Sequence, residues 1–241
     1  MLNLAAFEVM TFDCYGTLID WETGIWNALQ PVIANHQIEI AADQALELYG
    51  ELESEAERGQ YHEYRTVLGM VLKGFGSRLG FVPNETEVQR FSETVRDWPA
   101  FPDSARALQA LKRKYKLAIL SNIDDALFAF SAQRLGMQFD WVITAQQVKS
   151  YKPSLNNFHL GIERIGLPRS KILHVAQSLY HDIVPAKTLG LSTVWINRRH
   201  GKKGFGATPP AQVQPDLEVP DLQTLAEMIE LHESSGLRKH P

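Results

Sequence analysis

The chain is predicted to fold as an α/β protein, in which a parallel sheet carries helices on both faces and a helical domain is inserted after the first strand. Short apolar runs recur along the sequence, and each is followed by a pattern typical of a helix. Such alternation is typical of buried parallel strands with crossover helices. One long segment between the first two runs has helical patterns only. Together these observations predict a Rossmann-like sheet with a helical cap.

The strands of the sheet are expected at five apolar runs, residues 7–12, 116–120, 141–144, 172–176 and 193–196. A helix is expected at 104–114, before the second strand. Residues 198–215 are rich in Gly, Pro and basic residues, which predicts an exposed loop before a last short strand and a helix at 222–232. In such sheets the ligand crevice lies at the carboxyl ends of the strands. Polar residues directly after the runs should therefore face one pocket.

The segment 21–98 is predicted to form a separate helical cap domain. Gly59 and the stretch 80–84 break it, and its helical patterns cover residues 23–35, 42–57, 63–79 and 86–97. The α/β core would then consist of residues 1–20 and 99–241. The alternative is that these helices cover one face of a single compact domain.

Composition excludes several classes of protein. Of the 241 residues 44% are hydrophobic, which is enough for one large domain or for a core with an insertion. The net charge is −4 and no basic stripe occurs, so a small-molecule partner is expected and a nucleic acid is not. Cys14 is the only cysteine, which excludes an internal disulfide and a cysteine-based metal cage.

The amino terminus is expected to be a first strand rather than a signal peptide. It lacks a basic run, and Glu8 and Asp13 interrupt its apolar stretch. No apolar stretch approaches the roughly 20 residues that a membrane span needs. A cytoplasmic protein without a membrane partner is therefore expected.

The run from Phe12 to Leu18 is the most informative motif. Asp13 follows a buried strand and precedes a turn that contains Gly16. Burying a carboxylate without partners costs several kcal/mol, so the position favours a functional role. An isolated Asp of this kind often only caps the next helix, but three other polar clusters also follow strands.

These clusters occur in a fixed order along the chain. Ser121 and Asn122 follow the second strand, where short polar side chains near a helix start can bind an anion, although Asn122 or Asp124 could instead cap that helix. Lys152 follows the third strand, and a lysine near a buried carboxylate holds it ionised. Asp182 lies in the loop after the fourth strand, beside Tyr180 and His181, for which packing roles are at least as plausible.

With its motifs in this order, the sequence resembles the haloacid dehalogenase superfamily over nearly its whole length. The resemblance implies that Asp13 is a nucleophile that forms a covalent ester and that Thr17 orients it. It also implies that Ser121 and Asn122 bind the substrate and that Lys152 supports the nucleophile. Asp182 is expected to orient or deprotonate the water that hydrolyses the ester.

Two departures argue against phosphate chemistry. Phosphatases of this superfamily carry a second Asp two residues after the nucleophile, where this chain has Tyr15, and the first acidic position of the fourth loop is Gln177. Asp13 and Asp182 alone would make a poor magnesium site, because Mg²⁺ needs near-octahedral oxygen ligands. No metal or other cofactor is therefore expected, unless a phosphatase alternative holds, which would need Mg²⁺.

The Asp-x-Tyr-Gly-Thr form is similar to that of the type II 2-haloacid dehalogenases. It implies an (S)-2-haloacid dehalogenase that releases halide from a small 2-haloalkanoic acid and yields the 2-hydroxy acid. Tyr15 and Gln177 are further candidates for binding this small anionic substrate. The family's cap arginine has no counterpart in residues 21–40, and Arg65 is suggested in its place. Such enzymes are commonly dimers, so a homodimer is a further expectation that the sequence leaves undecided.

Three alternatives remain beside this hypothesis. One is a magnesium-dependent phosphatase with a degenerate metal site, and another is a hydrolase of this superfamily that acts on a different small carboxylic acid. The third is a non-catalytic binding protein. Retention of five motif residues speaks against the third: Asp13, Thr17, Ser121, Lys152 and Asp182.

Overall fold

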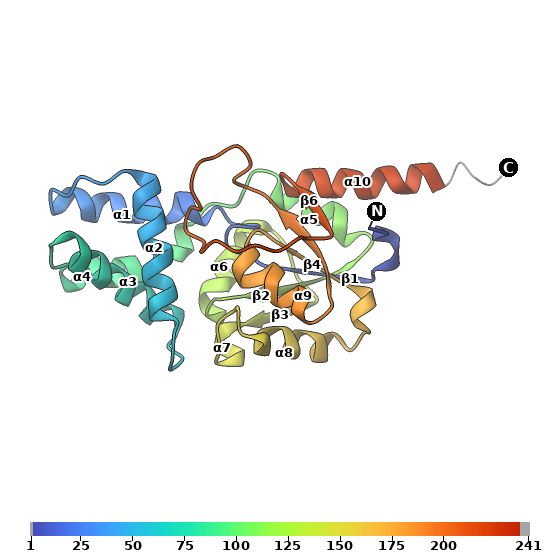
Figure 1. The fold of residues 1–241 in the computed structure, drawn as a ribbon, viewed down its shortest axis with the longest axis horizontal. Coiled ribbons are helices and arrows are strands. Elements are labelled where there is room, and N and C mark those ends of the chain that lie inside the picture. Colours follow the sequence, from blue (N-terminus) through green and yellow to red (C-terminus); the bar gives the residue numbers. More distant parts are fainter. Residues whose placement is uncertain (1, 237–241) are drawn as a thin grey trace.

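A six-stranded sheet lies at the centre of the computed structural model, which describes residues 2–236 (Figure 1). Its strand order is β3-β2-β1-β4-β5-β6, and every neighbouring pair is parallel. The predicted parallel sheet is confirmed. The strands are β1 (Val9–Phe12), β2 (Lys116–Ser121), β3 (Trp141–Thr144), β4 (Ile172–Ala176), β5 (Ser192–Ile196) and β6 (Leu217–Val219).

Helices cover both faces of the sheet because successive strand residues point to opposite sides. In β2, Leu117 and Ile119 belong to the larger hydrophobic cluster, whereas Ala118 and Leu120 belong to a second one. The larger cluster includes α5 (Ser104–Lys112), α6 (Asp125–Leu135) and α10 (Leu222–Gly236), and the second includes α8 (Leu155–Ile165) and α9 (Val184–Thr188). Figure 1 accordingly shows α5 and α10 on one side of the sheet and α8 on the other.

Residues 21–98, all of which the structure describes, contain no strand. Their helices lie to one side of the sheet, at the left of Figure 1, as α1 (Trp21–Asn35), α2 (Ala42–Ala56), α3 (Tyr64–Leu79), α4 (Glu85–Ser92) and the short η2 (Thr94–Asp97). Side-chain caps support the prediction of helices here: Asp20 accepts from the backbone of Thr23 at the start of α1. One hydrophobic cluster runs from Phe75 in this block to Phe12 in β1. Their division into two domains stays a prediction.

The predicted last strand and helix are present as β6 and α10, but two details of the carboxyl-terminal part differ from the prediction. The loop 198–215 is not exposed throughout, because Ala207 and Thr208 are buried. A Cβ atom on Gly50 of α2 would lie 2.6 Å from the Ala207 carbonyl oxygen, so only glycine lets the loop backbone approach this closely. Helix α10 also continues to Gly236 rather than stopping at residue 232.

Short helical turns complete the chain, namely η1 (Leu4–Ala6), α7 (Ala145–Val148), η3 (Arg169–Lys171) and the π-helical η4 (Leu179–Ile183). Within residues 2–236, no helix has both the length and the apolar character needed to cross a bilayer.

Candidate active site

The predicted motif residues meet at the carboxyl edge of the sheet. Phe12 at the end of β1 is in register with Ile119 of β2 and Val175 of β4, so the segments after these strands are neighbours. Gly16 turns the chain after β1 with a φ of 91°, a conformation that favours glycine. A Cβ atom there would also lie 2.8 Å from a side-chain oxygen of Gln177. The turn therefore brings Asp13 and Thr17 to the same edge.

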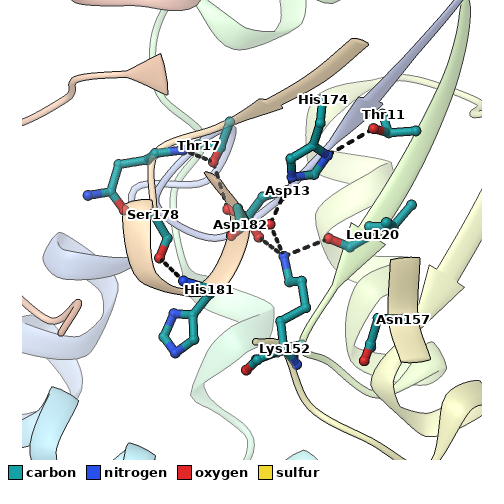
Figure 2. A network of polar contacts seen from close by, with 12 residues as sticks. Thr11, Asp13, Thr17, Leu120, Lys152, Asn157, His174, Ser178, His181 and Asp182 are labelled. Atoms are coloured by element: carbon teal, nitrogen blue, oxygen red, sulfur yellow. Dashed lines mark hydrogen bonds and ion pairs between the residues drawn. The ribbon is translucent and has the colours of Figure 1, made fainter. Parts of the chain in front are cut away.

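Lys152 joins the two buried carboxylates of the site (Figure 2). Its Nζ atom lies 3.0 Å from Oδ1 of Asp13 and 2.6 Å from Oδ1 of Asp182, and it donates to the Leu120 carbonyl at 2.9 Å. The residue is 1% exposed. Water therefore screens these charges weakly, and the ammonium interacts strongly with both aspartates.

Thr17 holds the other oxygen of Asp13. Its hydroxyl donates to Oδ2 at 2.6 Å and accepts at 2.9 Å from the backbone N–H of Gln177. Because the Gln177 N–H occupies the acceptor side of the hydroxyl, the hydroxyl proton points to Asp13. The carboxylate is thus fixed from both sides, by Thr17 and by Lys152.

Asp182 is also in contact with His174 of β4. Nε2 of His174 lies 3.0 Å from Oδ1 of Asp182, and its Nδ1 lies 2.8 Å from the hydroxyl of Thr11 in β1. The second oxygen of Asp182, Oδ2, is buried and has no hydrogen-bond partner among the described residues. A buried carboxylate oxygen without a partner is costly, so this atom is suited to accept from a bound water or ligand.

The two aspartates titrate differently. Burial raises the pKa of Asp13 above its ordinary 3.8, against the lowering effect of Lys152, and Asp182 raises it further. Burial would also raise the pKa of Asp182, but Lys152 and His174 bring it below 3.8. Burial would lower the pKa of Lys152, yet the two aspartates raise it above 10.5. At neutral pH Lys152 is therefore an ammonium, and Asp182 is the more acidic carboxylate.

A cavity opens directly onto these groups. It holds about 390 Å³ of free space, counting its open mouth. From the core side it is lined by Asp13, Tyr15, Ser121, Asn122, Lys152, Ser178, His181 and Asp182. The segment 21–98 contributes Trp21, Glu53, Glu57 and Tyr64, and the loop after β5 contributes Thr208. The site therefore lies between the sheet edge and the helical block.

Comparison with known proteins places this arrangement in a family. The model of the haloacid dehalogenase-like hydrolases matches residues 7–190. The chain belongs to this family. It is a hydrolase with a parallel sheet, as predicted.

Several curated relatives of this hydrolase are dehalogenases, although a pyrimidine 5′-nucleotidase of Escherichia coli (strain K12) is also similar, 26% identical over 140 residues. Haloacetate dehalogenase H-2 of Moraxella sp. (strain B) is 28% identical over 235 residues, which cover 92% of this chain and 97% of the relative. (S)-2-haloacid dehalogenase H-109 of Pseudomonas putida is 26% identical over 235 residues, covering 89% and 96%. The L-2-haloacid dehalogenase of Xanthobacter autotrophicus has the same fold, with a TM-score of 0.78 at 22% identity over 93% of this chain and 98% of that structure.

Three residues predicted to bind substrate lie differently from the expectation. Arg65 does not line the cavity, and its guanidinium pairs with Glu93 at 2.8 Å. The Gln177 side chain also lies outside it and accepts from Thr208 at 3.3 Å. Asn122 lines the cavity, but its amide oxygen and nitrogen both bind the backbone of Lys152, at 2.7 and 3.0 Å. Asn122 therefore positions Lys152.

Tyr15 and Ser121 do line the cavity. The hydroxyl of Tyr15 lies 3.0 Å from Ser131 Oγ, and its ring packs edge-on against Trp98. The hydroxyl of Ser121 is fully buried and has no partner among the described residues. Ser121 is thus the predicted binding residue that is free to meet a ligand.

Asp124 connects the core to the helical block. Its carboxylate accepts from the backbone N–H groups of Tyr64 and Arg65, at 2.8 and 3.1 Å, and so caps the start of α3. The sequence suggested that Asp124 caps the helix that follows it, α6, but its side chain makes no capping hydrogen bond there. Asp124 caps α3 instead.

Several functional candidates were missed from the sequence. His174 could have been noticed as a lone histidine within an apolar strand, in register with Thr11. Glu53 and Glu57 carry no such signal, because a helix with many glutamates is ordinarily a solvated surface. Their place in the cavity depends on how the helical block packs against the core.

The residues present do not suit the magnesium site of the phosphatase alternative. Mg²⁺ needs several oxygen ligands at close range. Lys152 Nζ already pairs with Oδ1 of Asp13 and Oδ1 of Asp182. Within the described part of the chain, no three His, Cys, Asp or Glu side chains are grouped so that they could hold a metal ion.

Proposed function

We propose that this hydrolase displaces halide from a small 2-haloalkanoic acid through a covalent ester on Asp13, as an (S)-2-haloacid dehalogenase. The observation that carries the proposal is the position of the buried Lys152 between the buried Asp13 and Asp182. There the ammonium balances one of two buried negative charges and keeps a carboxylate available as a nucleophile. The curated relatives named as dehalogenases support the same class of reaction.

The first half of the reaction needs an oriented carboxylate. An oxygen of Asp13 attacks the halogen-bearing carbon, the new C–O bond forms, and the halide leaves with the electrons of the C–halogen bond. Thr17 and Lys152 hold the carboxylate in one orientation, which lowers the entropic cost of reaching the attack geometry. No proton is transferred in this step.

The second half is hydrolysis of the ester. A water attacks the carbonyl carbon of the Asp13 ester and the ester C–O bond breaks. One proton of the water ends on the departing oxygen, which gives the 2-hydroxy acid, and the other is released to solvent as the Asp13 carboxylate is restored. We assign the orientation and deprotonation of that water to Asp182, whose free Oδ2 lines the cavity. His181 is a second candidate, because burial lowers its pKa to about 4 and leaves the ring neutral at pH 7.

Halide release tests the proposal directly. The protein is incubated with 2-chloropropionate and haloacetates in the presence of EDTA, and the assay is repeated with Asp13→Asn. Metal-independent halide release that this substitution abolishes supports the proposal. A single turnover in ¹⁸O water should place label in Asp13, because the water attacks the ester carbonyl. Phosphate release that requires added Mg²⁺ would instead favour the phosphatase. Absence of both halide and phosphate release across a broad panel of substrates would favour a binding protein.

A further inference from the structure

Helix α2 and the residue that caps its carboxyl end place two carboxylates in the cavity opposite the nucleophile. Glu53 and Glu57 are one helical turn apart, so they lie on the same face of the helix. Both line the cavity that Asp13 and Lys152 line from the core. Glu53 is 4% exposed, so this is an interior position and not a solvated surface.

Glu53 is held by neutral donors rather than by a cation. The hydroxyls of Tyr49 and Tyr64 donate to its Oε1 at 3.1 and 2.5 Å. Burial raises the pKa of both tyrosines, so they remain protonated donors. These contacts fix the direction of the Glu53 carboxylate without neutralising it.

The cavity as a whole has an excess of carboxylates. Its lining includes Asp13, Asp182, Glu53 and Glu57, against the single ammonium of Lys152 among the described residues. Lys152 is already shared between Asp13 and Asp182. Burial raises the pKa of Glu53 to about 7, and burial together with Glu53 raises that of Glu57, as expected for carboxylates that lack a counter-ion.

An unsatisfied group marks the same cavity as a ligand site. The hydroxyl of Ser121 is fully buried, lines the cavity and has no partner among the described residues. Buried polar groups are nearly always hydrogen-bonded, so this hydroxyl is expected to meet a polar group of a bound molecule. It lies on the core side, whereas Glu53 and Glu57 lie on the α2 side.

The two sides of the cavity thus differ in the groups that they can bind. On the core side, the hydroxyl of Ser121 can donate a hydrogen bond to a carboxylate of the substrate, and the positive charge of Lys152 attracts it. On the α2 side, Glu53 and Glu57 attract a cation or a hydrogen-bond donor and repel a second anion. A plain alkyl group would leave the two glutamates without a ligand.

We propose that Glu53 and Glu57 bind a hydrogen-bond-donating group, an ammonium or a hydroxyl, that the substrate carries beside its halogen-bearing carbon. The inference rests on the proposed function and narrows its substrate class. The substrate would be a 2-halo acid with a polar donor on the neighbouring carbon, rather than a simple haloalkanoic acid.

Four substrates that differ only in one terminal group test this selectivity. They are 2-chlorobutyrate, 2-chloro-3-hydroxypropionate, 2-chloro-3-aminopropionate and 2-chlorosuccinate, which present a methyl, hydroxyl, ammonium and carboxylate group. The kcat/KM for halide release should exceed that of the methyl compound on the order of tenfold for the two donors, and fall below it for the carboxylate. Reactions without enzyme correct for spontaneous halide loss.

Glu57→Gln should narrow the ratio between the ammonium and carboxylate substrates on the order of tenfold, because it removes a carboxylate that an ammonium group would pair with and hold ionised. Glu51→Gln is the matched control, since it removes the same charge from an exposed position of the same helix. The control should leave the ratio unchanged. If Glu57→Gln and Glu51→Gln changed the ratio of kcat/KM values equally, the effect would be a general one of charge, and the inference would be overturned.

Binding to Asp13→Asn separates this inference from the proposed function. In one outcome no substrate releases halide, yet the hydroxyl and ammonium compounds bind Asp13→Asn more tightly than the methyl compound does. If Glu57→Gln removes that difference in affinity, the assignment of Glu53 and Glu57 as a donor-binding site stands without the dehalogenase function. If all four compounds react equally, or 2-chlorosuccinate is preferred, the inference fails while the function survives. Absence of any preference in both turnover and binding also overturns it.

Discussion

His174 Nε2 lies 3.0 Å from Oδ1 of Asp182, and both side chains are at most 1% exposed. The other ring nitrogen, Nδ1, lies 2.8 Å from the hydroxyl of Thr11, so both ring nitrogens of His174 have partners. Asp182 thereby keeps a second donor besides Lys152. His174 does not line the cavity, so it acts as a positioning residue through Asp182.

Removal of this donor should change the titration of the site. His174→Leu is expected to raise the pKa of Asp182, because His174 helps to lower it, and to reduce kcat by about tenfold with a smaller change in KM. The acid limb of the kcat profile should move to higher pH. His174→Gln, which can still donate, should restore part of the rate. A uniform loss of rate at every pH, with no recovery in the Gln variant, would indicate a purely structural role.

Loss of the central ammonium should destabilise the fold at neutral pH. Lys152→Met leaves Asp13 and Asp182 buried without their shared cation, and we expect a cost of about 3 kcal/mol in the free energy of unfolding. Asp13→Asn in the same background should recover part of that cost, since one uncompensated charge is removed. Urea unfolding of the two single variants and the double variant at pH 7 measures the coupling. Strictly additive effects would contradict the ion-pair geometry.

The stability contribution of Glu53 should depend on pH with a defined sign. Burial raises its pKa from 4.5 to about 7 in the folded protein, so the folded state binds a proton more tightly than the unfolded state. This contribution is fully present below pH 4.5 and is lost as the pH rises through 7. The difference in unfolding free energy between the native chain and Glu53→Gln should fall by about 3 kcal/mol over that window. A difference that stays constant from pH 4.5 to pH 8 would exclude the raised pKa.

The contact between Asp124 and α3 should anchor the helical block beside the site. Asp124→Ala removes the acceptor for the Tyr64 and Arg65 N–H groups, with an expected cost of about 1–2 kcal/mol. Amide hydrogen exchange should accelerate in the first turn of α3, while β1 and β2 stay protected. Asp125→Ala is a control, because that side chain binds Thr144 and Gln147 within the core. Faster exchange at the start of α3 in the control as well would point to general loosening.

Much of the site was predictable because its residues follow strands. The carboxyl ends of neighbouring parallel strands lie at one edge of the sheet, so Asp13 and Ser121 had to be close once the strands were identified. Lys152 and Asp182 lie further along the chain, after α7 and within η4, and their side chains meet at 2.6 Å. For Asp13 and Ser121 the position depends on one short strand, which the local pattern of apolar residues reveals.

The sequence by itself determined the α/β class, the parallel sheet, the helical block and the edge where the motif residues gather. Only the tertiary structure decided that Arg65 turns to Glu93, that Asn122 holds the Lys152 backbone and that Glu53 faces the cavity. The physical reason is that the direction of a helical side chain depends on how its helix packs against distant segments. Periodicity locates a strand and its end, but contacts far apart in the chain orient α2 over the nucleophile.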